Sequence, residues 1–467
     1  MSRSVLFLAY FFPPRGGAGV QRSVKFVKYL PDFGWRPLVV ANGGTTQDWV
    51  SPVEDQTLLK DVPADTVVRY TRLNEREERV YRNSQKKWRH RLSITDPIHW
   101  WVSPAVRLGR EMIAEHKPDL IYVTMSPFTA AKAGMELKAA TGLPLVLDLR
   151  DPWTLDETRM YPTKWHVRRD RAAMSAAFAA ADRIIMNTPM SAERAAEAFP
   201  KETRQGGKIT FITNGYDAAD FGRTDPTPVE PSPRDVLRIV HTGSFHSEMA
   251  RLWDDLFAKR GWVNKFKTAL RPINLWTRTP RYLLEAMERV TQSGEIPADK
   301  LELVLVGEVT PSDRAMVESS PVAKMVKLLG YRTHVESVRW VESADVLFLP
   351  NHTPLDGGPT LIVPGKTYEY LGSGRPILAM GPPGDMQEFV RQTSSGACVA
   401  GDDGAGAARL LADWYRAKLD GRTPANPDRS AVERFERRAL TERLAATLDG
   451  VVGGAPAGAR EPQAIGT

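Results

Sequence analysis

The sequence predicts an α/β protein of two domains, each built on a mostly parallel sheet that helices cover on both faces. Three observations support this prediction: short apolar runs alternate with helical patterns, a proline-rich stretch interrupts the alternation, and the same pattern then restarts. A chain of 467 residues is also too long for one core, at roughly 100–200 residues per domain. We therefore expect domains at 1–220 and 236–430, joined by a linker at 221–235.

The first half opens with a strand, a glycine loop and a helix. SVLFLAYFF at 4–12 is a continuous apolar run of the kind that a buried parallel strand shows. A loop with Gly16, Gly17 and Gly19 follows, and then a helix with apolar residues at helical spacing. The same signals recur as strands at 36–41, 119–124, 143–149 and 182–188, and as alanine-rich helices at 129–141 and 170–181.

The linker at 221–235 separates the halves because it holds four prolines and no apolar periodicity. In the second half, strands are expected at 237–243, 301–307, 344–350 and 375–380, and helices at 281–292 and 366–372. An amphipathic closing helix at 431–450 is expected to return to the first domain. The tail at 451–467 is rich in Gly, Ala and Pro, which is typical of disorder.

The amino-acid composition bears on the cellular compartment of the protein and on the class of its binding partners. The 63 basic and 56 acidic residues leave a net charge of +7, which favours anionic partners such as phosphates or a membrane surface and does not choose between them. We expect no nucleic acid partner. The single cysteine, Cys398, excludes an internal disulfide framework and a cysteine metal cluster. The chain has no apolar run of about 18 residues and no signal for cleavage near its start. We expect a cytoplasmic protein.

The glycine loop does not fit a dinucleotide cofactor. When Gly17 and Gly19 are aligned with the dinucleotide fingerprint, Arg22 falls where a third glycine must let helix and strand pack closely. The second strand candidate ends near Asn42, without the acidic residue that would hold a ribose. The loop therefore either brings backbone close to another ligand or only makes a turn. The histidines lack zinc spacing and no Asp-x-Asp pair occurs, so we expect neither a metal nor a cofactor.

The segment at 364–380 combines features of an anion site. Pro364 and Gly365 make a turn into a helix whose first backbone amides are unpaired donors. Lys366 adds a positive charge there, and Glu369, one turn later, is an acceptor of the type that pairs with two sugar hydroxyls. The segment fits a nucleotide diphosphate with its ribose, and equally a capped helix with a solvated lysine and glutamate.

Separated motifs in a fixed order carry a family resemblance over nearly all of 1–450. In chain order they are YFFPPRGGAGVQRSVKFVKYL, DLRDPW, TNGYD, HTGSF, RTPRYLLEAM, VLVGE, LLGYR, ESADVLFLP and PGKTYEYLGSGRPIL. Together they resemble the glycosyltransferases of family 4, in the bacterial branch with a K-x-Y-E-Y-L helix. This resemblance implies the GT-B fold, in which two Rossmann-like domains face each other across a cleft.

The resemblance also implies an activity. We expect a hexosyltransferase that moves a sugar from a nucleotide diphosphate sugar, UDP-linked above all, to a glycan or lipid-linked acceptor, with retention and without a metal. Such an enzyme would serve cell-surface polysaccharide or glycolipid synthesis. The first domain would bind the acceptor and the second the donor.

The family's roles fall on particular residues of this chain. The glycines Gly16, Gly17 and Gly19 are expected to face the diphosphate across the cleft, and Asp148, Arg150 and Asp151 to lie near the acceptor. Asp151 is the candidate for accepting or orienting the acceptor proton, although an Asp-Arg pair also fits a structural ion pair. Expected donor contacts are Gly243, Arg278, Tyr331, Arg332, Gly358, Pro364, Gly365, Lys366 and Glu369. The cations among them would stabilise charge on the departing diphosphate.

Two departures from the family pattern bear on specificity and location. Leu361 stands where many members carry a glutamate, so either backbone at Gly357 and Gly358 replaces it or the donor differs. An insertion at 247–277 is basic and holds three tryptophans. With the stretch 69–101, which includes Trp88, Trp100 and Trp101, it would dock on the inner face of a membrane or form a solvated helix that buries its aromatic side chains.

Two alternatives to transfer remain open at this point. A nucleotide-sugar epimerase would act on the donor without an acceptor. A non-catalytic relative, suggested by Leu361, would bind a nucleotide and transfer nothing.

Overall fold

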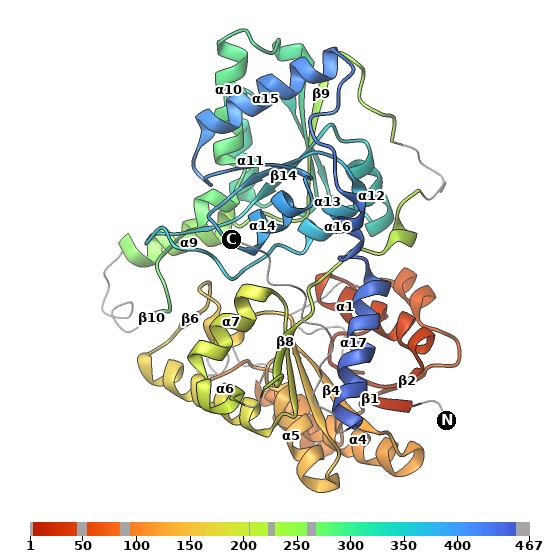
Figure 1. Ribbon diagram of the computed structural model, residues 1–467. Helices are drawn as coiled ribbons and strands as arrows, with labels where there is room; N and C mark the ends of the chain where they lie inside the picture. Colours follow the sequence, from red (N-terminus) through yellow and green to blue (C-terminus); the bar gives the residue numbers. More distant parts are fainter. Residues whose placement is uncertain are drawn as a thin grey trace. The chain divides into compact units, whose positions relative to one another are not determined.

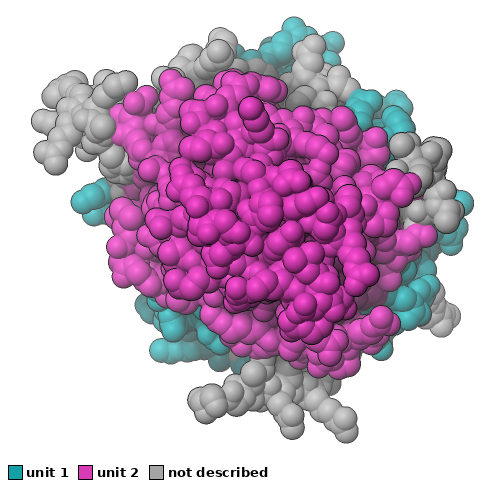
Figure 2. Space-filling view, turned by 90° about the horizontal axis from the view of Figure 1, so that it is seen from above, with its two compact units in different colours: residues 1–214, 437–467 teal, residues 215–436 magenta. Residues whose placement is uncertain are grey.

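The computed structural model describes residues 3–43, 54–84, 94–204, 206–222, 229–258 and 268–453. The chain divides into two compact units, coloured separately in Figure 2 and traced in Figure 1. Unit 1 comprises residues 1–214 and 437–467, and unit 2 comprises residues 215–436. Residues 215–220, which the sequence assigns to the first domain, therefore belong to unit 2.

Unit 1 is built on a parallel sheet of seven strands among the described residues. The spatial order is β3-β2-β1-β4-β5-β7-β8. The strands are β1 (Arg3–Ala9), β2 (Trp35–Ala41), β3 (Val67–Tyr70), β4 (Leu120–Met125), β5 (Leu145–Leu149), β7 (Arg183–Met186) and β8 (Ile209–Phe211).

Helices cover both faces of this sheet. On one face, side chains of α4, α5 and α6 pack on Leu6, Leu8 and Ile121. On the other face, α1 and α17 lie side by side (Figure 1) and pack on Val5 and Phe7. Among its described residues, the α-helices of unit 1 are α1 (Ala18–Tyr29), α2 (Glu75–Ser84), α4 (Val102–His116), α5 (Ala130–Thr141), α6 (Lys164–Ala180), α7 (Pro189–Ala198), α8 (Pro200–Thr203) and α17 (Arg437–Val452).

Unit 2 repeats this design with six parallel strands in its main sheet, counted over the residues described. Their order is β13-β12-β9-β14-β16-β17. The strands are β9 (Leu237–Thr242), β12 (Leu301–Val306), β13 (Val326–Gly330), β14 (Val346–Pro350), β16 (Ile377–Met380) and β17 (Gly396–Val399).

The helices of unit 2 also form two layers, which Figure 1 shows on either side of the sheet. Helices α10 and α15 pack on one face, whereas α12, α13, α14 and α16 pack on the other. The α-helices are α9 (Ser247–Ala258), α10 (Arg281–Gln292), α11 (Pro311–Glu318), α12 (His334–Glu342), α13 (Lys366–Ser373), α14 (Asp385–Gln392), α15 (Gly404–Leu419) and α16 (Arg429–Glu433).

The structure confirms the predicted α/β class and all the strands that the sequence indicated. Four strands of the two sheets were not predicted: β3, β8, β13 and β17. Each of them is an edge strand of its sheet, and its side chains are mostly only partly buried. Edge strands need no continuous apolar run, so they lack the signal by which the central strands were found.

The closing segment is two helices where the sequence predicted one at 431–450. Helix α16 ends at Glu433 in unit 2, and α17 begins at Arg437 in unit 1. Between them, the carbonyl of Phe435 accepts a hydrogen bond from the Tyr216 amide at 3.1 Å. The tail from residue 454 and linker residues 223–228 lie outside the described residues.

Tyr216 also packs against helix α13. A Cβ atom at Gly372, on α13, would overlap the Tyr216 ring, which is buried. Glycine at position 372 therefore allows α13, which carries residues of the site described below, to pack closely on Tyr216.

Replacing Gly372 with alanine is therefore expected to destabilise the protein by about 1–3 kcal/mol, because the added methyl group overpacks the contact with Tyr216. Urea unfolding would measure the change. Gly365→Ala is the matched control at the start of the same helix: its φ is −57° and a Cβ there meets no atom within 4 Å. Equal stability of the two variants would contradict the prediction.

Candidate functional site

The predicted donor residues of unit 2 gather at the carboxyl edge of its sheet. Thr242, Val306 and Gly330 end three adjacent strands and are register partners. The residues that follow them, among them Gly243 and Tyr331, therefore leave the sheet at one place. This edge is where ligands bind in open parallel sheets.

Two glycines bring the backbone of this edge close together. Gly243 has a φ of +92°, a conformation that favours glycine, and its amide donates to the Val306 carbonyl at 2.7 Å. A Cβ at Gly307 would lie 2.6 Å from the Gly243 carbonyl oxygen. Since Gly243 itself is exposed, a ligand can approach its backbone.

Lys366, the first residue of α13, extends over Gly243. A Cβ on Gly243 would lie 3.3 Å from the Lys366 Nζ atom. The same Nζ lies 2.9 Å from Nε2 of His241, a fully buried residue of β9. Nδ1 of His241 lies 3.0 Å from the Phe348 carbonyl, which can only accept. Nδ1 therefore carries the hydrogen and Nε2 accepts from the lysine.

The electrostatics of this cluster favour a bound anion. Burial and the neighbouring Arg278 hold the pKa of Lys366 well below its usual value, against the opposing effect of Glu369. Burial and Lys366 likewise keep the pKa of His241 far below its usual range. Burial, followed by Arg278, lowers the pKa of His246 to about 3. The two histidines are thus neutral, and the mutually repelling cations gain stability from an anion between them.

Glu369 lies one turn beyond Lys366 on α13, so both side chains share a face of the helix. Glu369 is half-buried, and its Oε1 lies 3.7 Å from Nδ1 of His334. Nε2 of His334 in turn lies 3.3 Å from Asp220. The Tyr370 hydroxyl accepts a hydrogen bond from the Thr242 amide at 2.8 Å. The Tyr370 hydrogen bond holds α13 against the end of β9, and His334 links the same helix to α12.

The remaining predicted donor residues are more peripheral. Tyr331 follows β13 with 63% of its surface exposed, and the guanidinium of Arg332 donates to the Tyr331 carbonyl at 2.9 Å. The Gly358 amide already donates to Asp356 at 3.0 Å, so in this arrangement it is not free to replace the glutamate missing at Leu361. Pro364 accepts from the Thr367 amide at 3.0 Å in the turn before α13.

The second half of the insertion at 247–277 packs against the rest of unit 2. Strand β11 (Ile273–Asn274) pairs antiparallel with β15 (Thr353–Pro354). Arg271 donates through Nε to Asp356 at 2.7 Å and through Nη1 to the Pro359 carbonyl at 2.6 Å. A Cβ at Gly358 would lie 2.5 Å from this guanidinium. The insertion therefore holds the loop that leads to Leu361.

The aromatic residues of the two tryptophan-rich stretches are largely internal. Trp100 and Trp101 belong to the core of unit 1, and Trp253 is buried on α9. The indole of Trp276 donates to Asp254 at 2.6 Å, whereas Trp88 and Trp262 lie outside the described residues. Within the ranges that the structure describes, no helix has the length and apolar character to cross a bilayer.

In unit 1, Asp148 is enclosed in the core and not open to an acceptor. Its two oxygens accept from Nε and Nη2 of Arg22 at 2.8 and 2.7 Å, and Oδ2 also accepts from the Tyr122 hydroxyl at 2.6 Å. Neither charged side chain is more than 1% exposed. Asp148 is therefore one half of a buried ion pair that joins α1 to β5.

The Arg150 side chain also has partners within unit 1, which include backbone carbonyl groups. Its guanidinium donates to the Gly19 carbonyl and, at 2.9 Å, to that of Ser126. Gly17 precedes α1 with a φ of +93°. Arg150 therefore braces the glycine loop, and Asp151 alone of the three predicted residues is exposed.

An acidic neighbour accompanies Asp151. Burial raises the pKa of Asp156 to about 6. Hydrogen bonds from Thr158 oppose this rise, and the negative charge of Asp151 adds to it. The Asp156 side chain accepts from the Thr158 amide at 2.8 Å. An exposed carboxylate beside a partly protonated one can accept or orient a hydroxyl proton.

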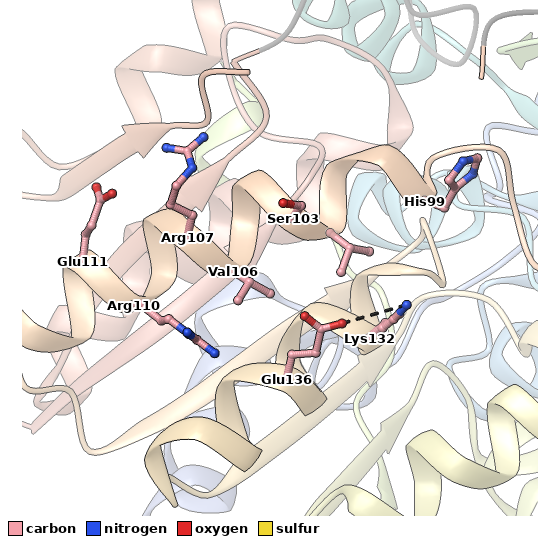
Figure 3. Close-up of a pocket in the computed structure, with 9 residues that line it drawn as sticks. His99, Ser103, Val106, Arg107, Arg110, Glu111, Lys132 and Glu136 are labelled. Atoms are coloured by element: carbon pink, nitrogen blue, oxygen red, sulfur yellow. Dashed lines mark ion pairs between the residues drawn. The ribbon is translucent and has the colours of Figure 1, made fainter. Parts of the chain in front are cut away.

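A separate cavity of about 560 Å³ lies in unit 1 along α4 and α5. Figure 3 shows its lining of charged and polar side chains around Val106. Two of these, Ser103 and Arg107, donate to Glu77 at 2.9 Å each. No residue predicted for the site lines this cavity.

Sequence reasoning missed three residues with positioning roles: His241, Arg22 and Arg271. His241 lies in the motif HTGSF, two residues before the predicted Gly243, and a histidine inside an apolar strand was the available signal. Arg22 appeared only as a misfit to a glycine fingerprint. Arg271 carried no signal, because its partner Asp356 is 85 residues away.

Loss of the Arg22 charge is expected to destabilise unit 1 by about 3–5 kcal/mol, because Arg22→Met leaves the buried Asp148 carboxylate uncompensated. Denaturant unfolding would measure the change, and Arg22→Met with Asp148→Asn should recover part of it. The control is Arg82→Met, which removes an exposed ion pair with Glu78 and should cost less than about 0.5 kcal/mol. Comparable losses in both single variants would refute the structural role.

Acid is expected to weaken the fold through His246. Its pKa is about 3 in the folded protein and about 6.5 when unfolded, so the unfolded chain takes up the proton first as the pH falls. The unfolding free energy should therefore decline from pH 6.5 towards pH 3, by at most about 1.4 kcal/mol per pH unit for this group. His246→Gln should flatten the decline in urea unfolding at pH 6.5 and 4.5. Parallel pH curves for both proteins would argue against it.

Comparisons with known proteins bear on the family and on the fold. The family model described as a glycosyl transferase 4-like domain matches residues 16–215. No curated protein matches the sequence.

Solved structures share the fold over almost the whole chain. Anabaena HepE, in complex with UDP and glucose, is 16% identical with a TM-score of 0.54, over 96% of this chain and 100% of that chain. Sucrose-phosphate synthase from Thermosynechococcus elongatus is 14% identical with a TM-score of 0.57, over 97% and 100%. A putative UDP-N-acetylglucosamine 2-epimerase from Listeria monocytogenes is 12% identical with a TM-score of 0.53, over 96% of each chain.

The two parallel sheets, one in each unit, match those of GT-B glycosyltransferases. Residues 16–215 therefore match a glycosyl transferase 4-like domain, and the chain has the GT-B fold.

Proposed function

We propose that this protein transfers a hexosyl group from a nucleotide diphosphate sugar, with UDP as the carrier, to a glycan or lipid-linked acceptor. Retention of configuration, independence of metal ions and a role in cell-surface polysaccharide or glycolipid synthesis complete the proposal. The family match supports a transferase. Structures of Anabaena HepE hold UDP and UDP-glucose, which supports this donor class.

The observation that carries the proposal is the position of Lys366 over the exposed backbone of Gly243, with Arg278 near enough to lower its pKa. A diphosphate brings the negative charge that this cluster favours. When the sugar–phosphate bond breaks, further charge develops on the departing diphosphate. Cations and helix-end amides already aimed at it lower the barrier, because they need no reorganisation at that moment.

The rest of a nucleotide fits the residues around this cluster. Glu369, three residues after Lys366, is assigned to the ribose, because a carboxylate can accept hydrogen bonds from both of its hydroxyl groups. The exposed ring of Tyr331 and the adjacent Arg332 are assigned to the base, since aromatic and guanidinium planes stack on bases.

On the acceptor side, Asp151 is assigned to the attacking hydroxyl. It is exposed, and its neighbour Arg150 is held on backbone carbonyls. Gly16, Gly17 and Gly19 are assigned to the diphosphate, as the resemblance implies. Asp148 is left out of the chemistry because it is buried in its pair with Arg22.

We further propose that the protein works in the cytoplasm, at the inner face of the membrane where lipid-linked acceptors are found. Exposed Met249 and Leu252 on α9 offer apolar contacts for this. The buried Trp100 and Trp101 take no part.

A second candidate is a nucleotide-sugar epimerase, because the putative epimerase from Listeria monocytogenes shares the fold. The two functions differ in what they need. An epimerase converts the donor alone, whereas a transferase requires an acceptor. Incubation with UDP-sugars alone, followed by analysis for an isomerised sugar, separates them.

UDP is expected to raise the unfolding temperature, because binding stabilises the folded protein. At a UDP concentration one hundred times its Kd, the free energy of unfolding should rise by about 2.7 kcal/mol. Glu369→Gln should weaken UDP binding about tenfold, because a carboxylate acceptor of charge-assisted hydrogen bonds is lost. It should also abolish the preference for UDP over 2′-deoxy-UDP, which lacks one of the paired hydroxyls. Calorimetric titration of both nucleotides measures this.

Glu318→Gln is the matched control, since Glu318 is an exposed residue of α11 in the same unit. It should leave both affinities unchanged. If no nucleoside diphosphate shifts the unfolding temperature, the proposed function fails.

A further inference from the structure

We propose that His241 is a positioning residue for the donor: its neutral ring holds the ammonium group of Lys366 over the Gly243 backbone, ready for a diphosphate. This inference rests on the proposed function. It adds to that function the residue that keeps the lysine in place.

The His241 ring is itself held from three sides. It is fully buried on β9. It stacks on Phe245 with ring centroids 4.0 Å apart and planes 11° from parallel. Its Nδ1 hydrogen is fixed by the Phe348 carbonyl of β14 at 3.0 Å. Since the ring cannot turn without losing these contacts, Nε2 presents its lone pair in one direction.

That lone pair meets Lys366 at 2.9 Å. A lysine side chain has many rotamers, and restricting them costs entropy that a bound ligand would otherwise have to offset. The ammonium group has three donors. His241 takes one of them, and two are left for phosphate oxygens beside Gly243.

A neutral acceptor suits this task better than a carboxylate. A carboxylate would hold the lysine and also cancel its charge, so it would compete with the diphosphate. The charged and titratable groups that interact with Lys366 are His241 on β9, His246 and Arg278 on the segments around α9 and β11, and Glu369 on its own helix. His241 stays uncharged because burial and the lysine keep its pKa low, so the positive charge of the cluster is kept for the ligand.

A matched pair of variants tests this role. His241→Asn keeps a donor near the place of Nδ1, for the Phe348 carbonyl, and loses the acceptor that faces Lys366. His241→Gln carries a carboxamide oxygen far enough out to replace Nε2. Isothermal titration with UDP and with uridine, on the full chain, gives the readout. We expect His241→Asn to weaken UDP binding about tenfold and to leave uridine binding unchanged, since uridine has no diphosphate.

His241→Gln should retain most of the affinity for UDP, whereas a purely structural role would make both variants equally weak. In a Lys366→Ala background, His241→Asn should have no further effect on UDP binding, because it acts through the lysine. Unchanged uridine affinity in each variant also verifies that the unit is folded.

The outcomes separate the two proposals. If the wild type binds no nucleoside diphosphate, the proposed function and this inference both fail. If it binds UDP but the Asn and Gln variants weaken binding equally, or if His241→Asn still acts without Lys366, only the role of His241 is overturned.

Discussion

The parallel pairing of the strands is the constraint on which the rest of this structure depends. It places all carboxyl ends of a sheet at one edge, so residues distant in sequence meet there without any further device. In unit 2 the ends of β9, β12 and β13 are register partners. Helix α13 completes the edge, because the Tyr370 hydroxyl binds the Thr242 amide. The order of the strands and this one contact of α13 therefore place the ammonium group of Lys366 beside Gly243.

The central architecture was predictable from the sequence, and the reason is physical. Buried parallel strands such as β1 and β9 must be apolar on both faces, which leaves an uninterrupted run in the sequence. The edge strands are relieved of this requirement, so β3, β8, β13 and β17 escaped prediction. The break before α17 escaped too, because the amphipathic pattern continues across Arg434–Glu436 while the chain leaves one unit for the other.

The site was predictable only as far as local motifs reach. Lys366, Glu369 and Gly243 stand in segments whose local pattern already indicates a helix start or a turn. The roles of Asp148 and Arg150 depend on partners far away in the chain: Arg22 is 126 residues from Asp148, and Gly19 is 131 from Arg150. No spacing rule links such pairs, so the sequence did not indicate that Asp148 binds α1 and that Arg150 binds the glycine loop. Arg271 shows the same limit in unit 2, where an insertion that suggested a membrane contact holds the loop before Leu361.

The setting of Lys366 has a consequence for its chemical reactivity. An amine is nucleophilic only when it is unprotonated, and a lysine of ordinary pKa is almost never so at neutral pH. Burial and Arg278 lower the pKa of Lys366, so its share of free amine exceeds that of the surface lysines. Electrophilic reagents such as activated esters should acylate it selectively while the diphosphate is absent. The residue that we propose to bind the diphosphate is thereby also a point of covalent attack for inhibitors.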